Sequence, residues 1–179
     1  MSTIFVLTTI FIALSILVEA ILLGLQLVGR RLTRWLGTYA FSFFACVVLT
    51  LWFVLLYLLI RLQYEEHPLF HMSAFVRYVG LVLFFTGIIL AAWSFSLLGV
   101  KRVLCINFFV DNVSLVTGSV YRYLKNPAHY GFWLALIGFA VYTGSWYNFA
   151  IALEFVVVMI PIIWLENKPL QDARPRRTG

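Results

Sequence analysis

The sequence predicts an all-α integral membrane protein with about five transmembrane helices, the last two of which form a tight helical hairpin. Of its 179 residues, 63% are hydrophobic and only 11% are charged, whereas about 25% of the residues in a soluble globular chain are charged. Long apolar runs recur along the chain and are separated by short basic connectors. We expect a single transmembrane domain over residues 1–179.

The first three predicted spans follow from the lengths of their apolar runs. A helix needs about 20 apolar residues to cross the hydrocarbon core of a bilayer. Three runs meet that length, at residues 3–28, 38–60 and 78–100. We therefore expect a transmembrane helix in each of them.

The last apolar run predicts a hairpin. It covers residues 130–165, which is too long for one span, and Gly144 and Ser145 interrupt it with a turn signal. The expected arms are residues 130–143 and 146–165. The first arm would rise only ~20 Å, against a hydrocarbon core of ~30 Å. We expect its cytoplasmic end to lie within the membrane boundary, which would leave a recess there.

The basic residues predict an orientation. Lys and Arg gather on the cytoplasmic side of membrane proteins, and in the five-span arrangement eleven of the thirteen fall on one side. The eleven are Arg30, Arg31, Arg34, Lys101, Arg102, Arg122, Lys125, Lys168, Arg174, Arg176 and Arg177. We expect the N-terminus outside and both the polar insert at 101–129 and the C-terminus in the cytoplasm. Because orientation accounts for the basic charge, no nucleic acid is expected as a partner.

Two glutamates and one glutamine lie inside predicted spans. Glu19 and Gln26 share one face of the first helix, and Glu154 lies midway along the last. Ionisable groups at membrane depth are functional candidates, although such residues commonly serve as hydrogen-bonding contacts between helices. We favour the packing role and leave a ligand-binding role open.

Metal binding is not expected on the opposite side of the membrane. Glu65, Glu66, His67 and His71 cluster there, and the two histidines have the spacing of one helical face. However, Pro68 disfavours a helical turn between them. We interpret this connector as a solvated loop.

Several other site types lack their motifs. Cys46 and Cys105 have neither metal-ligand nor disulfide spacing, and we interpret both as packing residues. The chain has no glycine-rich dinucleotide or phosphate loop, and no serine follows a recognised catalytic order.

The insert before the hairpin is the densest polar segment. It combines aromatic and basic side chains, namely Tyr121, Arg122, Tyr123, Lys125, His129 and Tyr130. Pro127 favours a helix start, where backbone N–H groups receive anionic groups. Gly131 in the first turn would let a ligand approach the backbone. A belt of side chains that anchors the span at the headgroups explains the same composition equally well.

The order of several motifs carries a family resemblance. They are Leu98-Gly99, the stretch from Leu115 to Pro127, Tyr130-Gly131, Ser145-Trp146, and Glu166 before Pro169-Leu170. This combination resembles the membrane methyltransferases of the isoprenylcysteine carboxyl methyltransferase and phospholipid methyltransferase superfamily. The resemblance covers about residues 98–170. Membrane sterol reductases that use NADPH share part of it.

The resemblance implies an S-adenosylmethionine-dependent methyltransferase that acts on a lipid or an isoprenylated or otherwise lipophilic substrate reached from the bilayer. It implies three catalytic residues, Arg122, His129 and Glu166, and Glu166 would pair with the methionyl ammonium of the cofactor. The implied cofactor-binding residues are Tyr121, Tyr123, Asn126, His129, Tyr130, Gly131 and Glu166. A carboxylate suits a buried ammonium, and aromatic faces suit a sulfonium cation.

The chain departs from the family pattern in three residues and in its tail. Lys125 replaces a common Arg, His129 a common Tyr, and Asn167 the second Glu of a pair, and the tail after it is short. The main alternative is therefore a non-catalytic relative that serves as a structural subunit of a larger membrane complex. A reductase that uses NADPH is a weaker alternative, because only Arg122 and Lys125 are available for the dinucleotide phosphates.

Overall fold

The computed structural model describes residues 2–64, 69–99, 103–109, 119–124 and 126–172. Helices dominate these residues, and their only strand-like feature is an isolated antiparallel bridge between Leu69 and Ser145. The elements in chain order are α1 (Thr3–Leu27), α2 (Arg31–Leu36), η1 (Gly37–Tyr39), α3 (Ala40–Leu62), α4 (Ala74–Leu98), η2 (Ile106–Phe108), η3 (Ser119–Arg122), α6 (Pro127–Thr143) and α7 (Trp146–Asp172). The predicted all-α class is confirmed.

The long helices have the length and composition of membrane spans. Four segments qualify, namely α1, α2 continued by α3, α4, and α7 as far as Leu165. Helix α6 has 17 residues and would rise only ~25 Å, less than the ~30 Å hydrocarbon core. The length and apolar composition of these four segments identify the chain as an integral membrane protein. The expectation of a short arm agrees with α6, while a total of five spans stays a prediction.

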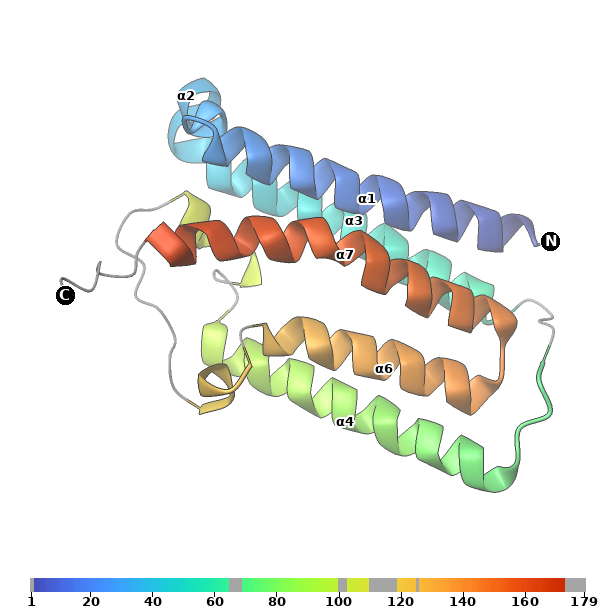
Figure 1. The fold of residues 1–179 in the computed structure, drawn as a ribbon. Helices are drawn as coiled ribbons and strands as arrows, with labels where there is room; N and C mark the ends of the chain where they lie inside the picture. Colours follow the sequence, from blue (N-terminus) through green and yellow to red (C-terminus); the bar gives the residue numbers. More distant parts are fainter. Residues whose placement is uncertain (1, 65–68, 100–102, 110–118, 125, 173–179) are drawn as a thin grey trace.

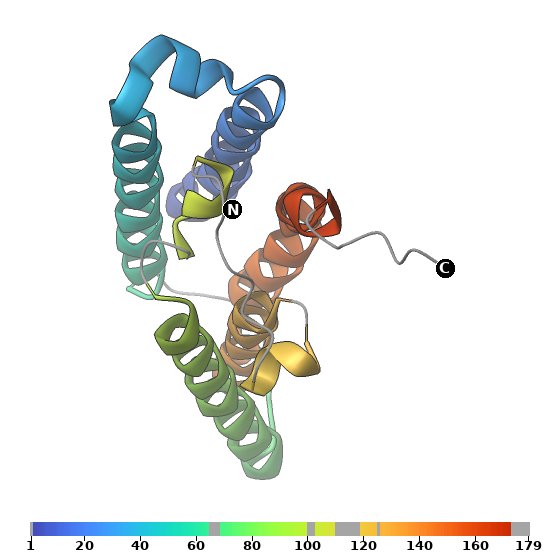
Figure 2. The ribbon, with the colours of Figure 1, turned by 90° about the vertical axis from the view of Figure 1, so that its left-hand side faces the viewer.

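The helices run side by side, with α6 between α7 and α4 (Figure 1). In the view turned by 90°, α1, α3 and α7 form one group and α4 with α6 forms a second (Figure 2). The main apolar core lies in the first group, around Ile12 and Leu23 of α1, Phe44 of α3, and Ile151 and Ile162 of α7. Helix α6 therefore has a neighbour on each of two opposite sides.

Helices α4 and α6 touch backbone to backbone. A Cβ atom built on Gly131 of α6 would lie 2.6 Å from the backbone nitrogen of Ala91, and one on Gly80 of α4 would lie 2.5 Å from that of Tyr142. Such approach is possible only for residues without side chains, as in the small-residue contacts of membrane helices. Gly87 and Gly138 repeat the contact seven residues along each helix.

One end of the bundle carries the α6–α7 turn, and we call it the hairpin end. Gly144 has a φ of 64° and ends α6, so the predicted hairpin turn is confirmed. The backbone N–H of Phe70 donates to the Gly144 carbonyl over 2.8 Å. The side-chain amides of Gln63 and Asn148 exchange hydrogen bonds of 3.1 and 3.3 Å, which tie α3 to α7.

The opposite end carries α2, η3 and the start of α6, and we call it the insert end (Figure 1). Gln26 is buried there, and its amide nitrogen donates to the Thr33 hydroxyl over 2.8 Å and to the Phe108 carbonyl over 3.1 Å. Gln26 thus joins α1 to α2 and η2, as the packing interpretation expects. Glu19 and Glu154 are half-buried on α1 and α7.

The two cysteines differ in their surroundings. Cys105 is buried beside η2, in agreement with a packing role, although its φ of 58° is unusual for a residue with a side chain. Cys46 is exposed on α3, so the same interpretation is wrong for it. Its sulfur lies on the outer surface of the helix group, where lipid is the expected neighbour.

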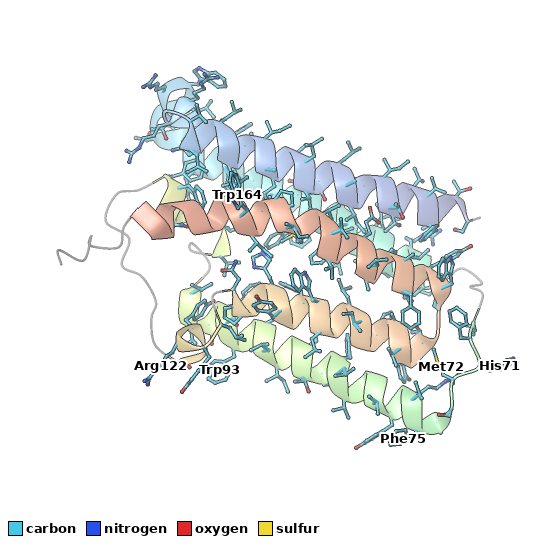
Figure 3. All side chains as sticks on the ribbon, in the orientation of Figure 1. His71, Met72, Phe75, Trp93, Arg122 and Trp164 are labelled. Carbon is cyan, nitrogen blue, oxygen red and sulfur yellow. The ribbon has the colours of Figure 1, made fainter. Side chains whose placement is uncertain are left out.

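The connector interpreted as a solvated loop is described in part. His71 is exposed at the hairpin end (Figure 3), whereas Glu65, Glu66 and His67 lie outside the described residues. Within the described ranges, no group of three or more His, Cys, Asp or Glu side chains could hold a metal ion.

Candidate functional site

The candidate site lies at the insert end, where η3 leads into α6. Of the insert predicted at 101–129, the structure describes 103–109, 119–124 and 126–129. Tyr121 fixes η3 to α4, because its hydroxyl donates to the Ser94 carbonyl over 3.4 Å. The aromatic part of the insert is therefore held against the last turns of α4.

Arg122 and Tyr123 point outward from the site. Both are exposed, and the guanidinium carbon of Arg122 lies 6.0 Å from the centre of the Tyr123 ring, within cation–π range. Arg122 extends outward at the insert end, far from Trp164 on α7 (Figure 3). This position suits contact with an anionic headgroup at the surface.

The start of α6 is built as the sequence predicts, but it lacks a side-chain cap. Pro127 is the first helical residue, and Asn126 precedes it with a φ of −131°. Asparagine at this position commonly accepts a hydrogen bond from the first turn, yet the Asn126 side chain forms no capping bond. Its amide nitrogen is buried and has no hydrogen-bond partner within the described ranges.

Helix α6 presents two opposite faces. Gly131, Ala135 and Gly138 face α4. At about 100° per residue, His129 and Trp133 fall on the other side of the helix, together with Asn126. Trp133 packs against the core of the α1–α3–α7 group, which confirms the direction of that face. A row of polar nitrogens therefore runs along the bundle-facing side of α6.

Burial changes the acid–base chemistry of His129. The residue precedes the apolar part of α6, and burial lowers its pKa from 6.5 to about 4, because an imidazolium loses hydration there. The ring is therefore neutral at pH 7. A neutral imidazole has one nitrogen that donates and one that accepts, so His129 has the charge state of a general base.

The other residues of the predicted site are placed differently. Tyr130 is 44% exposed at the rim, and its ring meets that of Trp133 edge to face at 5.4 Å. Gly131 faces α4, so helix packing explains its small size, and a cofactor role for it stays a prediction. Glu166 lies in the last part of α7, but its side chain is not among those that the structure describes. Lys125 lies outside the described residues.

The structure thus brings Asn126 and His129 together on one half-buried face and places Tyr121 and Tyr130 around the start of α6. It turns Arg122 and Tyr123 outward. Sequence reasoning missed Trp133, although its distance of seven residues from Asn126 puts both on the same side of a helix.

Comparison with known proteins identifies the family. No curated protein and no solved structure matches the chain. The family model of the phospholipid methyltransferases matches residues 75–173, more than half of the chain and the region that runs from α4 to the end of α7. The match confirms the resemblance drawn from the motifs. This chain belongs to the phospholipid methyltransferase family of membrane proteins.

Proposed function

We propose that the protein transfers a methyl group from S-adenosylmethionine to a lipid or lipophilic acceptor at the insert end. The observation that carries the proposal is a half-buried His129 that is neutral at pH 7 and, three residues before it, an Asn126 amide nitrogen with no hydrogen-bond partner among the described residues. Both lie at the start of α6, within the region that matches the family. In the expected orientation this end faces the cytoplasm, where the cofactor is available, while the acceptor arrives from the bilayer.

The residues present fit the cofactor. The buried amide nitrogen of Asn126 has no acceptor among the residues that the structure describes. An uncompensated buried donor is costly, so a ligand carboxylate or hydroxyl would satisfy it. Tyr121 and Tyr130 supply aromatic faces suited to a sulfonium. Glu166 would pair with the methionyl ammonium, because a carboxylate makes strong charge-assisted hydrogen bonds with such a group.

The role of His129 follows from its charge. When bound, S-adenosylmethionine would supply a methyl group: the lone pair of an acceptor atom would bond to the methyl carbon, the carbon–sulfur bond would break and a neutral thioether would leave. An ammonium acceptor must lose a proton before its lone pair can attack, and a hydroxyl acceptor loses its proton as its oxygen attacks. In either case the accepting nitrogen of His129 receives that proton and passes it to water. The protein otherwise contributes by positioning the acceptor and excluding water.

Calorimetry with the purified protein tests the cofactor part of the proposal. Wild type should bind S-adenosylmethionine, and Glu166→Gln, which keeps the shape and removes the charge, should weaken binding by roughly 1.5–3 kcal/mol. Glu65→Gln makes the same change in the connector expected on the opposite side of the membrane, and as the matched control it should bind like wild type. Equal affinity in wild type and Glu166→Gln would exclude the proposed pairing.

The alternative, a non-catalytic subunit of a larger complex, predicts a different outcome. Its support is the presence of Asn167 and Lys125 where the family has Glu and Arg. A wild-type protein that binds no S-adenosylmethionine and elutes only with partner subunits would favour this alternative.

A further inference from the structure

Three buried polar atoms have no hydrogen-bond partner in the part of the chain that the structure describes. They are the hydroxyl of Ser145, the amide nitrogen of Asn126 and the indole nitrogen of Trp133, whereas the Thr9 hydroxyl has the Glu154 carboxylate as a partner. Buried polar groups are almost always paired, so each exception requires an explanation. The two nitrogens stand apart, because both lie on the bundle-facing side of α6.

Trp133 is the sharper case of the two. An amide side chain can exchange its oxygen and nitrogen by rotation. An indole nitrogen is only ever a donor and keeps its hydrogen in every rotamer. The Trp133 ring is also held in place, by the apolar core on one side and by the Tyr130 ring at 5.4 Å on another. Its N–H therefore needs an acceptor that comes to it.

The position of Trp133 restricts the chemistry of that acceptor. Seven residues along a helix correspond to about 10 Å, so the indole lies about 10 Å deeper in the bundle than Asn126. The core that it packs against is apolar, and an anionic oxygen is costly in such surroundings. A neutral oxygen fits the site better. In a lipid whose headgroup reaches the insert end, the ester carbonyls lie deeper than the headgroup.

We infer that Trp133 is a substrate-binding residue whose indole N–H donates to an ester carbonyl oxygen of the lipid acceptor. The inference rests on the proposed function in that it takes the acceptor to be a lipid. The hydrogen bond positions the lipid along α6, with the headgroup at the level of His129 and the acyl chains directed into the bilayer. Trp133 thereby selects ester lipids over ether lipids with the same headgroup.

The variant Trp133→Phe keeps an aromatic ring and removes only the N–H. Trp93→Phe is the matched control, since Trp93 is 50% exposed on α4 near the insert end (Figure 3). The probes are a diester phospholipid and its diether analogue, each titrated into the protein. Wild type should bind the diester roughly 2- to 12-fold more tightly, the range of one neutral hydrogen bond. Trp133→Phe should bind both lipids alike, and Trp93→Phe should behave as wild type.

A second measurement uses the wild-type protein. With ¹⁵N-labelled tryptophan, the indole signal that is missing in Trp133→Phe should move when the diester lipid is added and should stay in place with the diether. A Trp133→Phe variant that still prefers the diester would overturn the inference, as would failure of wild type to bind either lipid. An indole signal that moves with S-adenosylmethionine alone would assign the donor to the cofactor and overturn it as well.

The two proposals fail separately. If the indole signal responds to the ester lipid but no methyl group is transferred, Trp133 holds a lipid in a non-catalytic relative. If methyl transfer occurs with no preference for the ester, the enzyme stands and the role of Trp133 is refuted.

Discussion

Gly138 lies at the α4–α6 contact, far along α6 from the insert end, and its replacement by alanine should destabilise the fold. The added Cβ would lie 2.7 Å from the Gly80 carbonyl oxygen and 2.8 Å from the Leu83 carbonyl carbon. These are backbone atoms, which cannot rotate away, so α4 must move by several tenths of an ångström or more. Overpacking of this kind costs about 1–3 kcal/mol, and the upper end applies because the whole helix must shift.

A gain in helix propensity partly offsets that cost. Replacing glycine by alanine inside a helix gains up to about 1 kcal/mol, which leaves a net destabilisation of about 2 kcal/mol. The control is Gly24→Ala in α1, because a Cβ at Gly24 meets nothing within 4 Å. Gly24→Ala gains helix propensity without a steric clash, so the free energies of unfolding of the two variants should differ by about 3 kcal/mol.

Reversible unfolding of the purified protein in mixed detergent micelles, followed by circular dichroism, gives both free energies. Gly138→Ala should unfold at a lower fraction of denaturing detergent than wild type, and Gly24→Ala at the same fraction or a higher one. A Gly138→Ala protein as stable as Gly24→Ala would refute the close backbone contact.

Three further predictions concern acid stability, topology and the hairpin end. Burial lowers the pKa of His129 from 6.5 to about 4, so between these pH values the unfolded state binds a proton more readily than the folded state. The free energy of unfolding should therefore fall by up to about 3 kcal/mol as the pH drops from 6.5 to 4. Thermal melts of His129→Gln should lack this pH dependence. For topology, an impermeant thiol reagent should label Arg34→Cys only from the cytoplasmic side and His71→Cys only from the opposite side, because both residues are exposed. Labelling of both variants from the same side would contradict the predicted orientation. At the hairpin end, Gln63→Ala should destabilise the bundle by about 1–3 kcal/mol, because it leaves the buried Asn148 amide without one partner. In the same melts, the double variant Gln63→Ala, Asn148→Ala should lose less free energy of unfolding than the sum of the two single variants.

Local signals accounted for much of the fold. Pro127 predicted a helix start and Gly144 with Ser145 predicted the hairpin turn, because each imposes its effect within one or two residues. The apolar run before Glu166 placed the last span at 146–165, which agrees with the membrane-compatible part of α7. These features needed no knowledge of tertiary contacts.

Long-range contacts were beyond the sequence reasoning. Gln26 reaches Phe108, 82 residues away, and nothing local to either residue indicates that pairing. Cys105 is buried, so a thiol reagent in solution would not reach it in the folded protein. For that reason labelling experiments need introduced cysteines.

The candidate site was predicted as a region rather than as a geometry. The motif placed Asn126 and His129 correctly at the start of α6, but it could not show that Arg122 points outward or that Gly131 faces α4. Gly80 and Gly87 have the same seven-residue spacing as Gly131 and Gly138. That pairing of spacings is the signal that could have assigned Gly131 to helix packing.

Methyl transfer is the most direct test of the central claim, that the insert end holds a methyltransferase site. The purified protein in lipid nanodiscs would be incubated with S-adenosylmethionine labelled on its methyl group, alongside His129→Phe, and the extracted lipids would be counted. We expect label in a lipid product of wild type and a large loss in His129→Phe, with both proteins equally folded by circular dichroism. A folded wild type that transfers no label to any lipid and binds no S-adenosylmethionine would contradict the claim.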